Sequence, residues 1–133
     1  MKILNTSGKR KKAIARAVIR EGNGKVRINK IPIELVKPKM ALLKLKEPLV
    51  LAGDLMNKVD IDVDIKGGGQ IAGAEAGRLA IAKALVNFSK SEKLKQTFLA
   101  YDRNLLIADV RQREPRKPNN RGKARQKKQL SKR

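Results

Sequence analysis

Apolar and charged residues alternate along the segment Val59–Lys66, whose sequence is VDIDVDIK. The β-branched residues take the odd positions, and Asp60, Asp62 and Asp64 take even positions. Successive side chains of a strand point to opposite faces, so this pattern predicts a strand with one apolar and one charged face. We expect the apolar face to point into the core.

A glycine break and a helix are predicted directly after this strand. Gly67, Gly68 and Gly69 carry no side chains, which favours a turn that another backbone or a phosphate can approach closely. Alanine then recurs at every fourth position, at Ala72, Ala76, Ala80 and Ala84. A helix collects these alanines on one thin face, so we expect the segment through Val86 to lie close against a sheet.

A β-hairpin is predicted near the N-terminus. Residues Ala13–Arg20 alternate in the manner of a strand, and Lys25–Asn29 forms a second short run of this kind. The Asn23–Gly24 pair between them tolerates positive φ at both positions, which favours a tight turn. We therefore expect these two strands to pair directly.

Two short helices are expected within residues 37–53. Pro38 and Pro48 each suit the first position of a helix, and Gly53 suits a C-terminal stop. The apolar residues expected to face the core are Met40, Leu43, Leu45, Leu49, Leu51 and Ala52, and those expected to face solvent are Lys39, Lys44 and Lys46. Further on, Ser89 and Glu92 have the spacing of a capping box, which predicts another helix that ends near Tyr101.

The composition favours a single domain without catalytic or metal chemistry. The 133 residues include 41% apolar but only 2% aromatic residues, as in a modest core of Ala, Ile, Leu and Val. The absence of a long apolar run and of a leader predicts an intracellular protein without a membrane span. Cys and His are absent, which argues against a disulfide framework, a metal site or an enzyme, and we expect no cofactor.

Basic charge gathers at the two ends of the chain. Of the net charge of +21, residues 1–12 contribute +5, residues 13–110 contribute +6 and residues 111–133 contribute +10. We therefore expect a basic N-terminal arm (1–12), a globular domain (13–110) and an extended basic tail (111–133) that is disordered on its own. Such ends suit a polyanion, and the near absence of aromatic residues favours the backbone and shape of folded RNA over its base sequence.

The glycine turn has more than one interpretation. Residues 67–72 formally match a dinucleotide fingerprint, but the acidic residue that should bind a ribose at the end of the next strand is missing. Two interpretations remain: the turn is purely steric, or its bare amides and the helix N-terminus face an RNA phosphate. Arg78 is equally open, because Glu75 lies one helical turn away and an ion pair between the two competes with a role on RNA.

The chain resembles the small-subunit ribosomal protein family nine over nearly its whole length. The pieces that carry the resemblance are Ser7–Lys11, Ala13–Arg20, Gly22–Asn29, Lys66–Gly69, Ala76 with Arg78, Ile81–Leu85, Asp109–Arg111 and Ser131–Arg133. Glu47–Leu49 and Arg113–Pro115 are similar to the archaeal and eukaryotic branch, whereas Gln129–Arg133 is closer to the bacterial form. Gly73 and Gly77 depart from the family, which usually has glutamine and a residue such as isoleucine there.

The resemblance implies an α+β fold, with helices packed on a two-layer mixed β-sheet and a left-handed βαβ crossover. The general preference for right-handed crossovers predicts the opposite hand. The family also implies a place in the head of the small ribosomal subunit in the cytoplasm, among small-subunit rRNA and neighbouring head proteins. The resemblance further implies that the tail threads through rRNA, so that Ser131, Lys132 and Arg133 contact the anticodon stem-loop of the peptidyl-site tRNA.

The residues expected to bind rRNA are glycines of the turn and cations of the domain and both ends. They are Lys9, Arg10, Lys11, Lys12, Arg16, Gly67, Gly68, Gly69, Arg78, Lys83, Arg111, Arg113, Arg116, Lys117, Arg121, Lys123, Arg125, Lys127 and Lys128. Two other functions stay open on the sequence: a free basic nucleic-acid-binding protein, such as a chromatin or RNA-chaperone factor, and a nucleotide-dependent enzyme built on the glycine turn.

Overall fold

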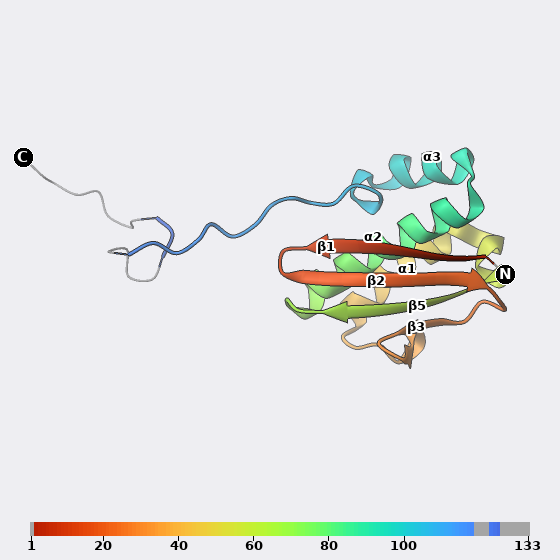
Figure 1. The fold of residues 1–133 in the computed structure, drawn as a ribbon, viewed down its shortest axis with the longest axis horizontal. Coiled ribbons are helices and arrows are strands. Elements are labelled where there is room, and N and C mark those ends of the chain that lie inside the picture. The colour runs from red at the N-terminus through yellow and green to blue at the C-terminus, as the bar shows by residue number, and fades with distance from the viewer. Residues whose placement is uncertain (1, 119–122, 126–133) are drawn as a thin grey trace, which may run out of the picture.

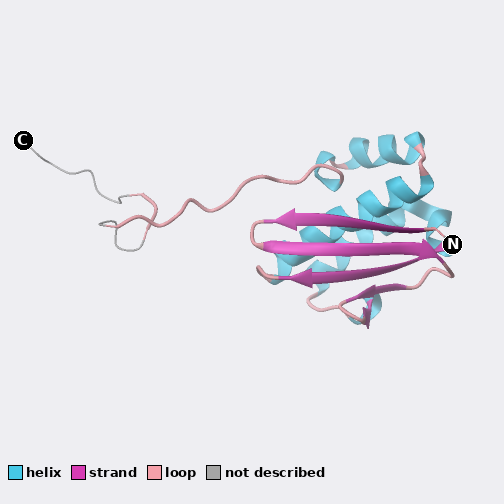
Figure 2. Ribbon diagram, viewed as in Figure 1, coloured by secondary structure: helices cyan, strands magenta, loops and turns pink. Residues whose placement is uncertain are grey.

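The fold is a five-stranded mixed sheet with helices on one face, seen in a computed structural model that describes residues 2–118 and 123–125 (Figure 2). The strands are β1 (Ile3–Arg10), β2 (Ala13–Glu21), β3 (Val26–Ile28), β4 (Ile31–Pro32) and β5 (Val59–Lys66). The α-helices are α1 (Lys39–Ala52), α2 (Gln70–Ser89) and α3 (Glu92–Tyr101), with short 3-10 turns η1 (Ile33–Leu35), η2 (Gly53–Lys58) and η3 (Arg103–Leu105). The expected α+β class is confirmed.

The strand β5 and the helix α2 form as the sequence predicts. Val59, Ile61 and Val63 are at most 1% exposed on the helix-covered face of the sheet, whereas the aspartates between them point to the open face. The helix begins at Gln70, immediately after the three glycines. Its alanine face is buried, with Ala76, Ala80 and Ala84 at 0% exposure, because it packs against the small residues of β1 and β2.

The contact between α2 and the sheet depends on missing side chains on both sides. In β2, Ala13, Ala15 and Ala17 are all fully buried beneath the helix. In β1, a Cβ atom added at Gly8 would collide with the carbonyl oxygen of Ala76 and lie 2.9 Å from the Ala80 nitrogen. Backbone atoms of strand and helix therefore meet where side chains normally intervene.

The parallel strands β3 and β5 are joined by a left-handed crossover. The sheet order is β1-β2-β5-β3-β4, and only the β3–β5 pair is parallel among the described strands. The chain leaves β3, passes behind the sheet through α1 and returns in β5 on the side of β2 (Figure 1). The hand implied by the family resemblance is confirmed, and the general preference for the right hand gives the wrong answer here.

The predicted hairpin between residues 13–20 and 25–29 is wrong. Strand β5 lies between β2 and β3, so these two strands do not pair. The Asn23–Gly24 segment instead wraps the start of β5, where the Asn23 and Lys25 amides both donate to Asp60 Oδ1 at 3.0 Å. The Lys25 hydrogen bond is the main cause that lowers the pKa of Asp60. The pairing of β5 with both β2 and β3 overrides the local turn signal.

The expected N-terminal arm is part of the sheet. Residues 3–10 form the edge strand β1, which pairs with β2 along its whole length. Alternate residues Leu4, Thr6, Gly8 and Arg10 turn toward α2, and the Thr6 hydroxyl donates to the Ala80 carbonyl at 2.8 Å. The basic charge of this segment hid its period-2 pattern, because Lys9 to Lys12 gather at the β1–β2 turn.

Residues 39–52 form one helix rather than two. Pro48 lies inside α1, where it is buried with Ala41 and Leu45 on one stripe. The other face is open, so Met40 and Leu43, which we expected in the core, are 60% and 50% exposed. The capping prediction is also shifted, because Ser91 and not Ser89 caps α3 and accepts from the Leu94 amide at 3.3 Å.

Gly73 and Gly77 of α2 face large side chains of neighbouring elements. A Cβ added at Gly77 would lie 2.7 Å from Leu45 Cδ2 of α1 and 3.0 Å from Ile65 Cδ1 of β5. A Cβ at Gly73 would lie 3.1 Å from Ile65 Cγ2. Leu45 and Ile65 therefore occupy the volume that a larger residue at position 73 or 77 would need.

Replacement of Gly8 by alanine is expected to destabilise the domain by about 1–3 kcal/mol or more, because the new methyl group meets backbone atoms that cannot rotate away. Urea unfolding of the full chain measures this change. Gly69→Ala is the matched control, since a Cβ at Gly69 meets nothing within 4 Å. Equal stability of Gly8→Ala and the wild type would contradict the close approach of β1 and α2.

Candidate nucleic-acid interface

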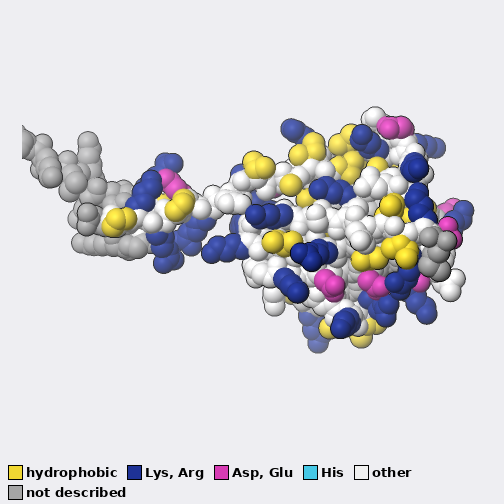
Figure 3. All heavy atoms as spheres, in the orientation of Figure 1, with side chains coloured by type: hydrophobic (Ala, Val, Ile, Leu, Met, Phe, Trp, Pro, Cys, Tyr) yellow, Lys and Arg dark blue, Asp and Glu magenta, His cyan; other side chains and the backbone are white. Residues whose placement is uncertain are grey.

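A basic groove of about 900 Å³ lies at the end of the sheet where three segments meet. These segments are the β1–β2 turn, the glycine turn before α2 and the chain that follows η3. Its lining consists of Lys9, Arg10, Lys11, Lys12, Ile14, Gly68, Gly69, Ala72, Arg111, Gln112 and Arg113. Six of these described residues are cationic and none is acidic. The basic extension is the segment that begins at Arg111. In Figure 3, Lys and Arg side chains lie at the end of the domain from which this extension leaves, and also over the rest of the visible face.

The N-terminus of α2 opens into this groove. Its N-cap is Gly69, and no side chain caps the helix. The amides of the first turn of a helix lack partners within the helix, and the dipole of a long helix adds about half a positive charge there. Both effects add to the positive potential that the six cations create, so the groove suits an oxyanion.

The three glycines of the turn have different reasons to be glycine. Gly67 and Gly68 have φ of +75° and +66°, and a Cβ at Gly68 would lie 2.9 Å from the Ala13 Cβ atom. The steric interpretation is sufficient for these two. Gly69 has an ordinary φ of −88° and empty space where its Cβ would lie. Its missing side chain leaves the helix N-terminus uncovered toward the groove.

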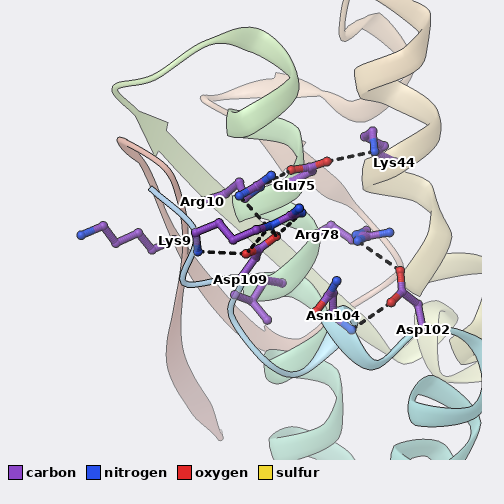
Figure 4. A pocket seen from close by; sticks show the side chains of 10 residues that line it. Lys9, Arg10, Lys44, Glu75, Arg78, Asp102, Asn104 and Asp109 are labelled. Carbon is purple, nitrogen blue, oxygen red and sulfur yellow. Dashed lines mark hydrogen bonds and ion pairs between the residues drawn. The ribbon is translucent and has the colours of Figure 1, made fainter. Parts of the chain in front are cut away.

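An ion-pair network borders the groove and holds the root of the extension (Figure 4). The Asp109 carboxylate accepts from Arg111 Nη2 at 2.7 Å and from the Arg111 amide at 3.0 Å. It also lies 3.3 Å from Arg10 Nη1 of β1. The hydrogen bonds from Arg111 are the main cause that lowers the pKa of Asp109 to about 2. The last residue of β1 and the start of the extension therefore share one carboxylate.

Glu75 of α2 extends this network to a third and a fourth element. It accepts from Arg10 Nε at 2.7 Å and from Lys44 Nζ of α1 at 3.1 Å. Burial by itself would raise the pKa of Glu75, but the hydrogen bonds from Arg10 and Lys44 outweigh it, and the pKa is lowered. A small cavity of about 250 Å³ lies among these side chains and is mostly polar.

Arg78 lies outside the groove and has partners of its own. Its side chain is 11% exposed and pairs with Glu47 of α1 and with Asp102, which follows α3. The pair with Glu75, one of the two alternatives for Arg78, is absent among the described contacts, because Glu75 pairs with Arg10 and Lys44. Arg78 thus ties helices together, and we leave it out of the candidate interface.

The other predicted site residues lie at varying distances from the groove. Arg16 is on the open face of the sheet, opposite Asp64 in the strand register, and Lys83 Nζ lies 3.3 Å from the Ser7 carbonyl oxygen. Arg116, Lys117, Lys123 and Arg125 are exposed along the extension, where Lys117 and Arg125 pair with Glu114. The predicted residues Arg121, Lys127, Lys128, Ser131, Lys132 and Arg133 lie outside the described residues.

Sequence reasoning missed the carboxylates of this region. Asp109 and Glu75 were not candidate site residues, although Asp109 lies two residues from an arginine at the start of the basic extension. Within the described part of the chain, no group of His, Cys, Asp or Glu residues could hold a metal ion. No described helix is long and apolar enough to cross a bilayer.

The fold and the site define a small basic α+β protein with a groove suited to phosphate groups. The model of the family described as ribosomal protein S9/S16 matches residues 8–133, and the chain belongs to this family. Small ribosomal subunit protein uS9 of Methanococcus vannielii is 50% identical over 119 residues, which cover 90% of this chain and 89% of that protein. The uS9 protein of Methanococcus maripaludis strain C7 has the same identity and coverage. The family is one of structural ribosomal proteins, not of enzymes.

The Asp109 carboxyl group is expected to titrate near pH 2 rather than near its ordinary pKa of 3.8. A lowered pKa means that the pair with Arg111 contributes stability above the ordinary pKa and loses it as the pH falls through about 2. The carboxyl ¹³C chemical shift of Asp109 in a pH titration measures this value. Arg111→Gln should raise the pKa, and a wild-type midpoint near the ordinary value would contradict the pairing.

Proposed function

We propose that this chain is a structural component of the small ribosomal subunit in the cytoplasm, and that its basic groove binds the sugar–phosphate backbone of small-subunit rRNA. Family membership supports the first part, because the Methanococcus relatives are named as small ribosomal subunit proteins. The observation that carries the second part is the groove itself. It combines an uncapped helix N-terminus with six cations, of which only Arg10 and Arg111 pair with the carboxylates described above.

The chemistry of the groove favours phosphate over bases. Arg113 can present two parallel N–H groups to a phosphate, Arg111 keeps the N–H groups that Asp109 does not engage, and the lysines of the β1–β2 turn act as point charges. No aromatic side chain lines the groove among the described residues, so nothing there can stack on an unpaired base. Recognition would rest on the spacing of phosphates in folded RNA, which is a matter of shape.

The basic extension adds length to this interface. Residues 111–133 carry eleven cations and one acid, and about 3.3 Å per extended residue gives a reach of roughly 75 Å. We infer that the extension runs along rRNA in the head of the subunit, beside neighbouring head proteins. We also infer that Ser131, Lys132 and Arg133 at its tip contact the anticodon stem-loop of the tRNA in the peptidyl site.

A free basic nucleic-acid-binding protein is the alternative on charge alone. Sedimentation of ribosomal particles at moderate salt distinguishes the two functions. A ribosomal protein stays with the small subunit at moderate salt, whereas a chromatin or chaperone factor appears in a free or DNA-bound pool. A nucleotide-dependent enzyme would instead gain thermal stability on addition of ATP.

Replacement of Lys11 and Lys12 by glutamine is expected to weaken rRNA binding and to flatten its salt dependence. If each lysine neutralises one phosphate, the slope of log K against log salt should fall in magnitude by about 1.4–1.8. Filter binding of the full chain to small-subunit rRNA over a range of salt concentrations measures it. Lys93→Gln with Lys95→Gln removes the same charge from exposed positions on α3. An equal loss in both double variants would contradict a role for the groove.

Deletion of Lys132 and Arg133 is expected to speed tRNA dissociation from the peptidyl site by about 5- to 30-fold, if two exposed charge contacts together contribute about 1–2 kcal/mol. Folding of the domain should stay unchanged. Release of labelled tRNA from subunits reconstituted with each chain measures the rate. The matched control is Lys93→Gln with Lys95→Gln, which removes equal charge from exposed positions on α3. Equal rates in wild-type and truncated subunits would contradict the proposal.

A further inference from the structure

The extension leaves the domain through one anchored residue. The Asp109 side chain is 16% exposed, whereas that of Arg111, two residues further on, is 79% exposed. The Asp109 carboxylate accepts hydrogen bonds from the Arg111 amide, Nε and Nη2, at distances from 2.7 to 3.1 Å. One carboxylate thus fixes both the backbone and the side chain of the residue with which the basic segment begins.

The other partner of Asp109 is part of the sheet and is also held by the helix layer. Arg10 closes β1, and its side chain is 15% exposed. Its Nε donates to Glu75 of α2 at 2.7 Å, and Glu75 also accepts from Lys44 of α1. A series of polar contacts therefore runs from Asp109 through Arg10 and Glu75 to the helix layer.

One nitrogen atom of the Arg10 guanidinium group has no hydrogen-bond partner in the described part of the chain and lies beside Asp109. Its Nη1 atom is buried and makes no well-aligned hydrogen bond among the described residues, yet it lies 3.3 Å from Asp109 Oδ2. Loss of the carboxylate charge would leave this part of the guanidinium group without a counter-ion, and a buried unpaired charge is unfavourable. The arrangement therefore favours one position of residue 109 on the end of β1.

We propose that Asp109 is a positioning residue that holds the root of the basic extension against β1, so that the extension starts in one fixed direction along the groove wall. Arg111 keeps most of its side chain exposed while Asp109 holds it, and Arg111, Gln112 and Arg113 all line the groove. The extension then starts at the groove, and the number of orientations that RNA binding must select is reduced.

The test measures the position of the extension in the full chain without RNA. The sequence has no cysteine, so nitroxide labels can be attached through the substitutions Asn87→Cys on α2 and Gln112→Cys. A chain released between Leu105 and Gln112 has an r.m.s. extent of about 15 Å. The wild-type distance distribution should be much narrower than this, and Asp109→Asn should broaden it toward that width.

Three further variants separate positioning from general loss of structure. Asp102→Asn removes a nearby carboxylate that pairs with Arg78 and should leave the distribution narrow. Asp109→Glu keeps the charge and should narrow the distance distribution again in part. Arg111→Gln removes the other partner of the Asp109–Arg111 ion pair, and it replaces Asp109→Asn in the test if that variant fails to fold. An unchanged distribution in Asp109→Asn, or equal broadening in Asp102→Asn, would overturn the proposal.

A second measurement tests whether the Asp109–Arg111 contact also positions the extension on bound RNA, and it rests on the proposed function. Iron–EDTA attached to the thiol of the Gln112→Cys variant cleaves nearby nucleotides of bound small-subunit rRNA. Cleavage should be focused when Asp109 is present and spread over more nucleotides when Asp109→Asn is added, at equal occupancy of the complex. Equally focused cleavage by both proteins would contradict a positioning role of Asp109 in the complex. If neither protein binds rRNA, the proposed function is contradicted, whereas the distance measurement on the free protein stays valid.

Discussion

The close contact between α2 and the sheet is the constraint on which the rest of the structure depends. Gly8 and the alanines of β2 let the alanine face of the helix approach until backbone atoms meet. Larger side chains at these positions would cost about 1–3 kcal/mol each in overpacking. Glycines within α2 also weaken the helix by about 1 kcal/mol each, so its stability rests on packing rather than on propensity.

This contact also determines the geometry of the candidate interface. Because α2 lies directly on β1 and β2, its N-terminus is level with the turn between these strands, and the lysines of that turn border the helix end. Gly67 and Gly68 allow the chain to turn against Lys12 and Ala13 with positive φ. The cations and the helix N-terminus are therefore brought together by the fold and not by any ligand.

The helices and strands that depend on local periodicity could be predicted from the sequence. The predictions were wrong where segments distant in the sequence decide which strands pair or which residues are buried. The alternation in β5 and the alanine repeat in α2 each determine a buried face without reference to the rest of the chain. The Asn23–Gly24 turn indicated a hairpin, but the Asn23 amide donates to Asp60 and the Gly24 amide to the Val59 carbonyl, and β5 displaces the return strand. Likewise, Pro48 marked a helix start by local rules, yet its buried ring keeps it inside α1.

In the candidate site, too, the residue types could be predicted from the sequence, but their contacts with distant segments could not. The cations were predictable, since charge is visible in the sequence and the groove gathers several of them. Which cations are engaged within the protein was not predictable, because Arg10, Lys44 and Arg78 meet carboxylates from distant segments. The resemblance supplied the left-handed crossover, which no rule applied to the residues alone would have predicted.

The carboxylates of this basic protein fall into two groups that have different consequences for RNA binding. Glu75 and Asp109 are at most 25% exposed and share the mostly buried Arg10 side chain, so a phosphate cannot easily replace them there. Glu114 is the only acid of residues 111–133 and holds Lys117 and Arg125 in more exposed pairs. Exposed pairs are weak and screened by salt, so phosphates of a nearby RNA would displace Glu114 readily. The protein would thus keep its groove fixed by buried pairs while the cations of its extension remain available for exchange.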